Sequence, residues 1–276
     1  MSEIREEELQ RFIDEDLGDT GDVTSDVLLS SDQQAEGALK AKQHCILAGV
    51  AEAREVFAHF GIQVEQVAED GDEVASGGTV LEVYGDAKSI LAAERLALNI
   101  VTRMTGIATL THELMETCRK KNPEVKVAAT RKTTPGFRRY EKKAVGLGGG
   151  MTHRYGLYDG IIIKDNHLAF MSIREAIRKA KQQLDMPVEV EVETVEEAVI
   201  AAEEEADVIM LDNMPPAKGK IAASEAREVY PDVVIEVSGG ITPDNITNYT
   251  YADVISLGWL THSVKSADLS LDLQRA

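Results

Sequence analysis

Residues 188–213 read VEVEVETVEEAVIAAEEEADVIMLDN. Alternating valines open this stretch, an apolar run near its end resembles a buried strand, and the segment between them has helical spacing. Thr194 followed by Glu197 fits the capping box that begins a helix. Two strands separated by one short helix are typical of a βα unit, whose strands lie parallel. The stretch therefore predicts a parallel sheet covered by helices.

The same alternation of strand and helix continues on both sides. Ser172 with Glu175 fits a second capping box, and Thr242 before Pro243 fits a helix start. Such a chain forms either a barrel or an open, doubly wound sheet. The glycine cluster before Met151 does not fit the dinucleotide-binding pattern GxGxxG, because the methionine occupies its last place, so the barrel is favoured. The candidate strands are 126–130, 160–164, 188–193, 208–211, 233–239 and 254–258.

The N-terminal part of the chain follows a different pattern. Residues 4–17 have helical spacing, and residues 37–84 break into short strand-like pieces around one helical segment. This mixture predicts a small α+β domain. A long amphipathic helical region follows at 89–121, and we expect Gly106 to break it in two, because glycine weakens a helix interior.

Charge is distributed unevenly along the 276 residues. The chain carries 29 Lys and Arg against 48 Asp and Glu, a net charge of −19, which disfavours nonspecific binding to nucleic acid. Twelve of the cations fall between Arg119 and Lys164, where three acids occur. We expect this basic island to serve a local anionic ligand, because crowding like charges costs stability. A solvated basic helix face is the alternative.

Other features favour a cytoplasmic protein. No apolar run approaches the roughly 18 residues that span a membrane, so no membrane partner is expected. The acidic N-terminus resembles neither a secretory signal nor a transit peptide. Cys45 and Cys118 are too few for a disulfide framework, and they suggest no metal site.

Reactive side chains of a βα barrel gather at the carboxyl ends of its strands. Arg131, Lys132 and Lys164 fall at such ends, and His153 and Arg154 lie in the loop before the second strand. So many donors exceed what one phosphate needs, and they would suit a substrate with two carboxylates plus a pyrophosphate. The weaker candidates are His167 and His262.

Carboxylates occupy other strand ends. Glu189, Glu191 and Glu193 alternate with valines, so they share one face of their strand. Together with Asp212 they could hold Mg²⁺ or ribose hydroxyls, while at least one of the three glutamates is expected to be solvated.

A turn of Ser238, Gly239 and Gly240 ends a further strand. It leads into the helix start expected at Thr242, which would offer backbone N–H groups and the positive end of a helix dipole to a phosphate. Barrels often bind phosphate in their last two loops, so Gly258 is the natural partner. Two tight turns that serve the backbone geometry alone are the alternative.

Residues 129–167 read ATRKTTPGFRRYEKKAVGLGGGMTHRYGLYDGIIIKDNH. This stretch closely resembles the quinolinate phosphoribosyltransferases, also called carboxylating nicotinate-nucleotide pyrophosphorylases, with RKTTPG, HR and KDNH as its specific motifs. Further blocks resemble the family in the same order over almost the whole chain. These blocks are EDLGDTGDVTSD (15–26), ERLALNIVTRMTGIAT (94–109), VEVEVETVEEA (188–198), VIMLDN (208–213), EVSGGIT (236–242) and ISLGWLTHS (255–263).

The resemblance implies a pentosyltransferase of NAD biosynthesis that converts quinolinate and phosphoribosyl pyrophosphate to nicotinate mononucleotide, pyrophosphate and CO₂, with Mg²⁺. It implies an N-terminal α/β sandwich at 1–108, to which a tail at 264–276 returns, and an incomplete α/β (TIM-like) barrel at 109–263. It also implies a homodimer or larger homo-oligomer, in which Arg95 of one subunit completes the site of its neighbour.

Roles for individual residues follow from the same resemblance. Arg131, His153 and Arg154, with Arg95 from the neighbour, would bind the carboxylates of quinolinate. Thr152 stands where many relatives carry Asn, and we expect this difference to tune the loop rather than abolish activity.

The remaining roles concern the phosphoribosyl substrate. Lys132 and Lys164 would reach its pyrophosphate and the second substrate, while Glu191 and Asp212 would hold ribose hydroxyls and Mg²⁺, directly or through water. The resemblance thus implies that these four residues are catalytic. The implied 5′-phosphate site consists of Ser238, Gly239, Gly258 and His262.

Three alternatives stay open at this point, because fold alone does not determine function. The nearest is another phosphoribosyl-transferring relative of the same fold, such as a nicotinate phosphoribosyltransferase or a related protein of molybdenum loci. A barrel isomerase or aldolase acting on a sugar phosphate would need an acid–base pair or a Schiff-base lysine, but no surplus of arginines. A non-catalytic phosphate-binding scaffold is the third.

Overall fold

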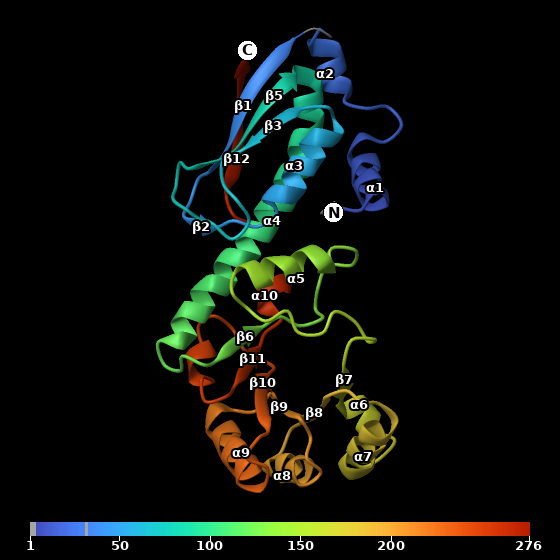
Figure 1. Cartoon of the computed structure of the whole chain (residues 1–276), viewed down its shortest axis with the longest axis vertical. Helices are drawn as coiled ribbons and strands as arrows, with labels where there is room; N and C mark the ends of the chain where they lie inside the picture. The colour runs from blue at the N-terminus through green and yellow to red at the C-terminus, as the bar shows by residue number, and fades with distance from the viewer. Residues whose placement is uncertain (1–3, 31–32) are drawn as a thin grey trace. The chain divides into compact units, whose positions relative to one another are not determined.

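The computed structural model describes residues 4–30 and 33–276 (Figure 1). The chain divides into two compact units. Unit 1 comprises Met1–Leu110, Gly146–Gly148 and Val264–Ala276, and unit 2 comprises Thr111–Val145 and Gly149–Ser263. Among the described residues, each helix is too short or too polar to cross a membrane.

Unit 1 is built on an antiparallel sheet. In spatial order its strands are β12 (Leu269–Arg275), β1 (Gln34–Ala41), β5 (Thr79–Asp86) and β3 (Gln63–Gln66). The last strand of the chain, β12, pairs with β1 in a register that runs from Ala35↔Arg275 to Ala41↔Leu269. The C-terminal segment therefore forms an edge of the sheet that the N-terminal segment begins.

Short elements complete unit 1. Strands β2 (Cys45–Ile46) and β4 (Glu73–Val74) pair with each other, and helix α3 (Val50–His59) lies against β3 and β5. Helices α1 (Glu6–Leu17) and α2 (Val23–Leu28) precede the sheet.

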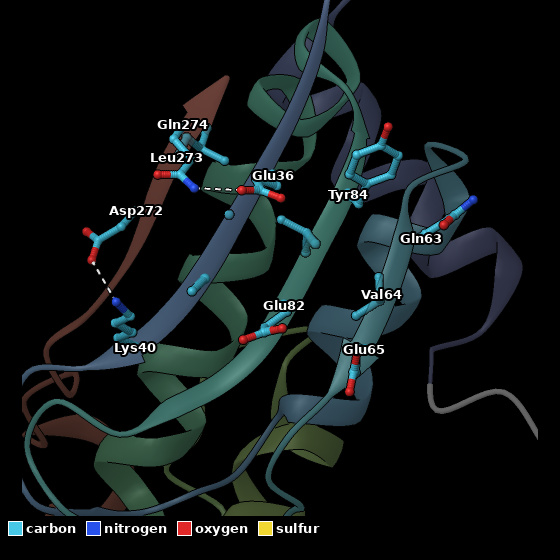
Figure 2. A pocket seen from close by; sticks show the side chains of 13 residues that line it. Glu36, Lys40, Gln63, Val64, Glu65, Glu82, Tyr84, Asp272, Leu273 and Gln274 are labelled. Carbon is cyan, nitrogen blue, oxygen red and sulfur yellow. Dashed lines mark hydrogen bonds and ion pairs between the residues drawn. The ribbon is translucent and has the colours of Figure 1, made fainter. Parts of the chain in front are cut away.

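Alternation along β1 gives the sheet one buried and one open face. Ala35 and Leu39 are buried, whereas Glu36 and Lys40 point to the open side. Figure 2 shows that polar side chains from neighbouring strands line this open face, where Gln274 donates a 2.6 Å hydrogen bond to Glu36. A shallow cavity of about 570 Å³ lies on the face, and none of the predicted site residues lines it.

Helix α4 (Ala87–Arg119) is continuous through Gly106, so the predicted break at this glycine is wrong. The glycine is explained by a close approach of another segment instead. A Cβ at position 106 would lie 2.2 Å from the carbonyl oxygen of Lys265, and Ala267 N–H donates a 2.9 Å hydrogen bond to the Thr102 carbonyl nearby. Glycine gives up some helix propensity here and makes room for the chain beside the helix.

Unit 2 contains a parallel sheet of βα units. Its described strands, in spatial order, are β6 (Lys126–Ala128), β11 (Val254–Ser256), β10 (Val234–Ser238), β9 (Val208–Asp212), β8 (Val188–Val192) and β7 (Ile161–Ile163). Every predicted strand of this half is present, which confirms the α/β class and the parallel arrangement. The two edge strands, β6 and β7, do not pair with each other within the described chain, so the barrel is incomplete, as expected.

Helices alternate with these strands. They are α5 (Arg138–Leu147), α6 (Asp165–Leu168), α7 (Ile173–Gln183), α8 (Val195–Glu203), α9 (Pro216–Val229) and α10 (Trp259–His262). Both predicted capping boxes are confirmed: Ser172 and Thr194 accept the N–H groups of Glu175 and Glu197, and each glutamate side chain bonds back.

The helix start predicted at Thr242 is wrong. Turns occupy this segment, and the next helical element is one turn of 3₁₀ helix, η1 (Ile246–Asn248). Asn245 accepts the Thr242 N–H at 2.8 Å and donates to the Gly240 carbonyl at 3.0 Å. Such local bonds between a side chain and the backbone compete with helix formation, so the glycine turn has no α-helix dipole behind it.

Candidate active site

A cavity of about 500 Å³ opens at the carboxyl ends of the strands of unit 2. Residues from all of these strand ends contribute to its walls, because parallel strands bring their ends to the same side of the sheet. The predicted site residues that line it are Arg131, Lys132, His153, Arg154, Lys164, Glu191, Asp212, Ser238 and Gly239.

Two arginines from different loops converge on this cavity. Arg131 is exposed. Arg154 donates a 2.7 Å hydrogen bond from Nη1 to the Gly160 carbonyl, while its Nε is buried without a partner. Burial and the positive charge of Arg131 both lower the pKa of Arg154. The pair forms a place where a bound anion would satisfy an orphaned donor and relieve repulsion.

Lys132 is fixed through its backbone. Its N–H donates to Thr130 Oγ1 at 3.1 Å, and its carbonyl accepts from Thr261 Oγ1 at 2.6 Å. These bonds hold the loop that follows β6, while the side chain remains accessible to a ligand in the cavity.

Lys164 and Glu191, at the ends of the neighbouring strands β7 and β8, form an ion pair in the cavity wall. Asp212, at the end of the adjacent strand, accepts a 2.5 Å hydrogen bond from Asn213 Nδ2. Glu193 lies beyond its strand and is exposed, which confirms that at least one glutamate of the series is solvated. Beside its cations, the cavity wall thus includes the paired Glu191 and the partly exposed Asp212.

His153 adopts a left-handed backbone conformation, with φ of 54°. The Arg154 N–H donates to its Nδ1 at 2.9 Å, and its Nε2 lies 3.3 Å from Glu236 Oε2 and 3.5 Å from Glu189 Oε2. Both ring nitrogens therefore have partners inside the protein. A ligand would reach either nitrogen only by displacing one of them.

Glu189 and Glu236 form a buried carboxyl pair beneath His153. Their side chains are 9% and 3% exposed, and each has one oxygen without a partner. Burial and the charge of Glu236 raise the pKa of Glu189 to about 8. Burial alone would lower the pKa of His153, but the Glu236 hydrogen bond and the two carboxyl charges raise it.

Three potential metal-ligand atoms of His153, Glu189 and Glu236 lie within 4.8 Å of one another. His153 Nδ1 accepts the Arg154 N–H, so a neutral imidazole carries its proton on Nε2, the nitrogen that faces the carboxylates. A protonated Nε2 has no lone pair for a metal ion, and a metal ion therefore does not fit this group. This group is therefore a hydrogen-bonded support.

The predicted phosphate turn lines the cavity but lacks the expected helix. Gly239 has φ of 84°, and a Cβ there would lie 2.3 Å from Asn213 Oδ1, so this position requires glycine. Gly258 and His262 lie just outside the cavity wall: a side chain at Gly258 would come within 2.9 Å of both the His262 ring and Lys132 Cδ.

Other candidates lie elsewhere. Arg95 is exposed on α4 and does not line the cavity. His167 accepts the Lys164 N–H at its Nδ1, at 2.9 Å, and so serves the start of α6. The basic island is only partly a ligand site. Its cavity-lining cations are Arg131, Lys132, Arg154 and Lys164, and its other eight cations lie outside the cavity wall.

Several residues at or near the site were not predicted from the sequence. Glu236 lies within an apolar run of the sequence. The one signal that could have indicated it as a site residue is a single carboxylate among valines and an isoleucine. Asn213 has φ of 52° and lines the cavity beside Asp212. Lys142, counted as one cation of the basic island, is fully buried next to the cavity loops.

The fold and this cavity define a class of protein: an α/β barrel protein whose cavity is lined by several cations and suits a ligand with several negative charges. Comparisons with known proteins narrow the class. A family model described as the quinolinate phosphoribosyl transferase N-terminal domain matches residues 22–105, and the C-terminal domain of the same family matches residues 107–272.

Individual proteins similar to this chain indicate the same family. The chain is 42% identical to a probable carboxylating nicotinate-nucleotide pyrophosphorylase of Methanocaldococcus jannaschii, over 97% of this chain and 96% of that protein. It is also 42% identical to its Bacillus subtilis counterpart, over 96% and 92% of the two chains. The solved structure of the nicotinate-nucleotide pyrophosphorylase from Francisella tularensis matches with a TM-score of 0.89 and 35% identity, over 99% of this chain and 98% of that one.

The chain belongs to the quinolinate phosphoribosyltransferase family. It is therefore an enzyme, a quinolinate phosphoribosyltransferase that acts in NAD biosynthesis.

Proposed function

We propose that the barrel cavity of this chain binds quinolinate and phosphoribosyl pyrophosphate together, and that its wall residues carry out the transfer. The observation that supports this most is the meeting of Arg131, Arg154 and Lys164 with Glu191 and Asp212 around one cavity. The cavity thus places cations that can bind several anionic groups next to carboxylates that can accept hydrogen bonds from ribose hydroxyls.

Quinolinate carries two carboxylates, and the converging arginines suit them. Arg131 is accessible, and Arg154 has a buried Nε without a partner, so each can donate charge-assisted hydrogen bonds to a carboxylate. His153 borders the same wall and supports Arg154 through the backbone hydrogen bond at Nδ1. In this proposal Arg95 of the partner subunit completes the carboxylate cluster in a homodimer or larger assembly.

The phosphoribosyl substrate takes the other side of the cavity. Lys132 and Lys164 reach its pyrophosphate, and Glu191 and Asp212 bind its ribose hydroxyls. Ser238 and Gly239, with Gly258 and His262 close by, take the 5′-phosphate. Because no α-helix begins directly after the glycine turn, Ser238 and Gly239 would hold the phosphate through turn backbone and side chains, without a helix dipole behind that turn.

Mg²⁺ fits the carboxylates of this cavity. Glu191 and Asp212 lie at the ends of adjacent strands and supply oxygen donors, and Mg²⁺ is usually held by one or two carboxylates plus substrate phosphates. These two residues would hold the ion, directly or through water. When bound, the ion would neutralise charge on the pyrophosphate.

The reaction then proceeds in two stages. The C1–oxygen bond of the sugar breaks and pyrophosphate leaves with the electron pair, while the cavity carboxylates stabilise the positive charge on the ribose. The aligned ring nitrogen of quinolinate forms the new bond to C1. The resulting pyridinium accepts the electron pair of the C2–carboxylate bond as CO₂ leaves. A proton from water then takes the place of the carboxyl group at C2.

A substrate comparison tests this function. Purified protein with Mg²⁺ and phosphoribosyl pyrophosphate should consume quinolinate and release CO₂ and nicotinate mononucleotide in equal amounts. Efficient use of nicotinate without CO₂ release would instead indicate a nicotinate phosphoribosyltransferase. Borohydride trapping of a sugar phosphate on Lys164 would indicate the aldolase alternative. The cytoplasmic setting expected from the sequence forms part of the same proposal.

A further inference from the structure

Two loops bring the arginines of the cavity together. The first cationic loop, residues 130–134, carries Arg131, and the second cationic loop, residues 152–155, carries Arg154. Both loops are bonded to the first half of helix α5, which contributes no residue to the cavity wall.

Arg138, the first residue of α5, bonds to both loops at once. Its Nε donates to Thr133 Oγ1 at 2.8 Å, and its Nη1 donates to the Tyr155 carbonyl at 2.9 Å. The planar guanidinium presents its donors in a fixed fork, so this one side chain sets the spacing between the first and second cationic loops.

Lys142, one turn further along α5, holds the second loop again. Its ammonium donates to the Thr152 carbonyl and lies 5.4 Å from the centre of the Tyr155 ring. The residue is 0% exposed, and burial, followed by the charge of Arg138, lowers its pKa to about 8. Burying an ammonium group without a carboxylate partner costs free energy, so stability alone gives little reason for a lysine here.

Glu141 makes the equivalent contact to the first loop. Its carboxylate accepts the Thr134 N–H at 3.0 Å and the Thr134 hydroxyl at 3.1 Å, and the residue is 0% exposed. Neighbouring positions of one helix thus fasten each cationic loop through buried charged side chains.

These attachments oppose a repulsion that the site itself creates. Arg131 and Arg154 face the same cavity, and the charge of Arg131 disfavours the charged form of Arg154. Without an anion, two loops carrying like charges would separate unless other contacts held them. A held pair of arginines binds an anion with less loss of conformational freedom.

We infer that Arg138 and Lys142 are positioning residues, which clamp the two cationic loops so that Arg131 and Arg154 are preorganised for one dianionic ligand. The inference deepens the proposed function and rests on it, because quinolinate is the ligand that the clamped arginines would receive. Neither residue touches the substrate in this account. Lys142 holds the second cationic loop alone, so its effect falls on the binding of quinolinate. Arg138 also holds the first cationic loop, whose Lys132 reaches the pyrophosphate in this account.

The test compares Lys142→Met with the matched control Lys143→Met, which makes the same change at the next, partly exposed position outside the cavity wall. Lys142→Met should raise the KM for quinolinate about 10-fold or more, as expected for the loss of a charge-assisted hydrogen bond that orders a site. The KM for phosphoribosyl pyrophosphate should change less than about 3-fold, because Lys142 contacts the second cationic loop alone. Lys143→Met should match the wild type in both KM values.

Arg138→Lys is the second variant, and it keeps the test decisive if Lys142→Met does not fold. It retains the charge but can reach one loop rather than both, so the KM for quinolinate should again rise. The KM for phosphoribosyl pyrophosphate is no criterion for this variant, because the first cationic loop also carries Lys132. A wild-type KM for quinolinate in either folded variant, or an equal rise of both KM values in Lys142→Met, would overturn the inference. Absence of quinolinate turnover by the wild type would refute the proposed function and the inference together, whereas the other outcomes leave the function standing.

Discussion

Lys164 and Glu191 are paired between the ends of neighbouring strands, with the glutamate side chain 12% exposed and the lysine 40% exposed. The pair gives the cavity one cation and one carboxylate whose positions depend on each other. Loss of either partner leaves an unpaired charge in a partly buried site, which costs more than the pair itself contributes.

Glu191→Gln removes a carboxylate from the wall that faces the ribose. We expect kcat to fall about 100-fold or more, the magnitude typical of losing a preorganised electrostatic group that stabilises a transition state. The matched control is Glu193→Gln, which makes the same change at an exposed position two residues further along the chain and should keep wild-type kinetics. Steady-state kinetics of both variants measure this effect. A kcat within about 3-fold of wild type for Glu191→Gln would show that Glu191 has no role in catalysis.

Arg131→Ala should raise the KM for quinolinate and also reduce turnover. Its guanidinium is the accessible arginine of the cavity, and a lost charge-assisted hydrogen bond is worth about 1.5–3 kcal/mol, or roughly 10-fold to 150-fold. Arg119→Ala, at the exposed end of α4, is the control. Near wild-type kinetics for Arg131→Ala would place the quinolinate carboxylates elsewhere.

The proposed contribution of Arg95 to a neighbouring subunit can be tested by mixing. Arg95→Ala and Lys164→Ala should each be nearly inactive alone. After dissociation and reassociation of the two variants, a symmetric dimer with shared sites should recover about a quarter of wild-type activity, because half of the dimers are hybrids with one intact site. A mixture that stays inactive, although hybrid dimers form, would mean that Arg95 does not act across the interface.

Burial of Lys142 predicts an unusual dependence of stability on pH. Its pKa falls from 10.5 to about 8 in the folded protein, where burial opposes the charge and Arg138, Arg131 and Arg154 add to that effect against Asp159. Between these two values the unfolded chain binds more protons, so the free energy of unfolding rises with pH. The wild type should gain about 2 kcal/mol relative to Lys142→Met between roughly pH 7.5 and 9.5. Chemical denaturation of both proteins at each pH measures this difference, and a constant difference would contradict a buried, charged lysine.

Thr152→Asn should change the kinetics little. Lys142 bonds to the backbone carbonyl at this position, and either side chain leaves that carbonyl in place. We expect both KM values to stay within about 3-fold of wild type, since surface changes without a lost contact are usually worth less than about 0.5 kcal/mol. A large selective rise in the KM for quinolinate would show that the threonine side chain itself shapes the second cationic loop.

Local signals in the sequence predicted most of the barrel. Residues 160–164 and 188–193 have the short apolar patterns of parallel strands, and Ser172 and Thr194 carry capping partners three residues later. Because parallel strands end on one side of their sheet, the residue pattern was also enough to place their terminal side chains around one cavity.

Features that depend on distant contacts were not predictable in this way. Gly106 weakens a helix locally, but the chain at Lys265 packs against it. Thr242 and Pro243 fit a helix start, but the Asn245 side chain supplies the competing bonds. Glu236 has its hydrogen-bond partner in His153, which lies 83 positions away in the chain, and no local pattern indicates such a partner.

The central claim is that Arg131 and Arg154, held by their two loops, receive the carboxylates of quinolinate in the barrel cavity. A crystal structure of the protein with quinolinate bound tests it most directly. We expect one carboxylate within hydrogen-bond distance of each of these arginines, with the ring nitrogen facing the side of Lys164 and Glu191. Quinolinate bound outside this cavity, or bound within it without touching either arginine, would contradict the account.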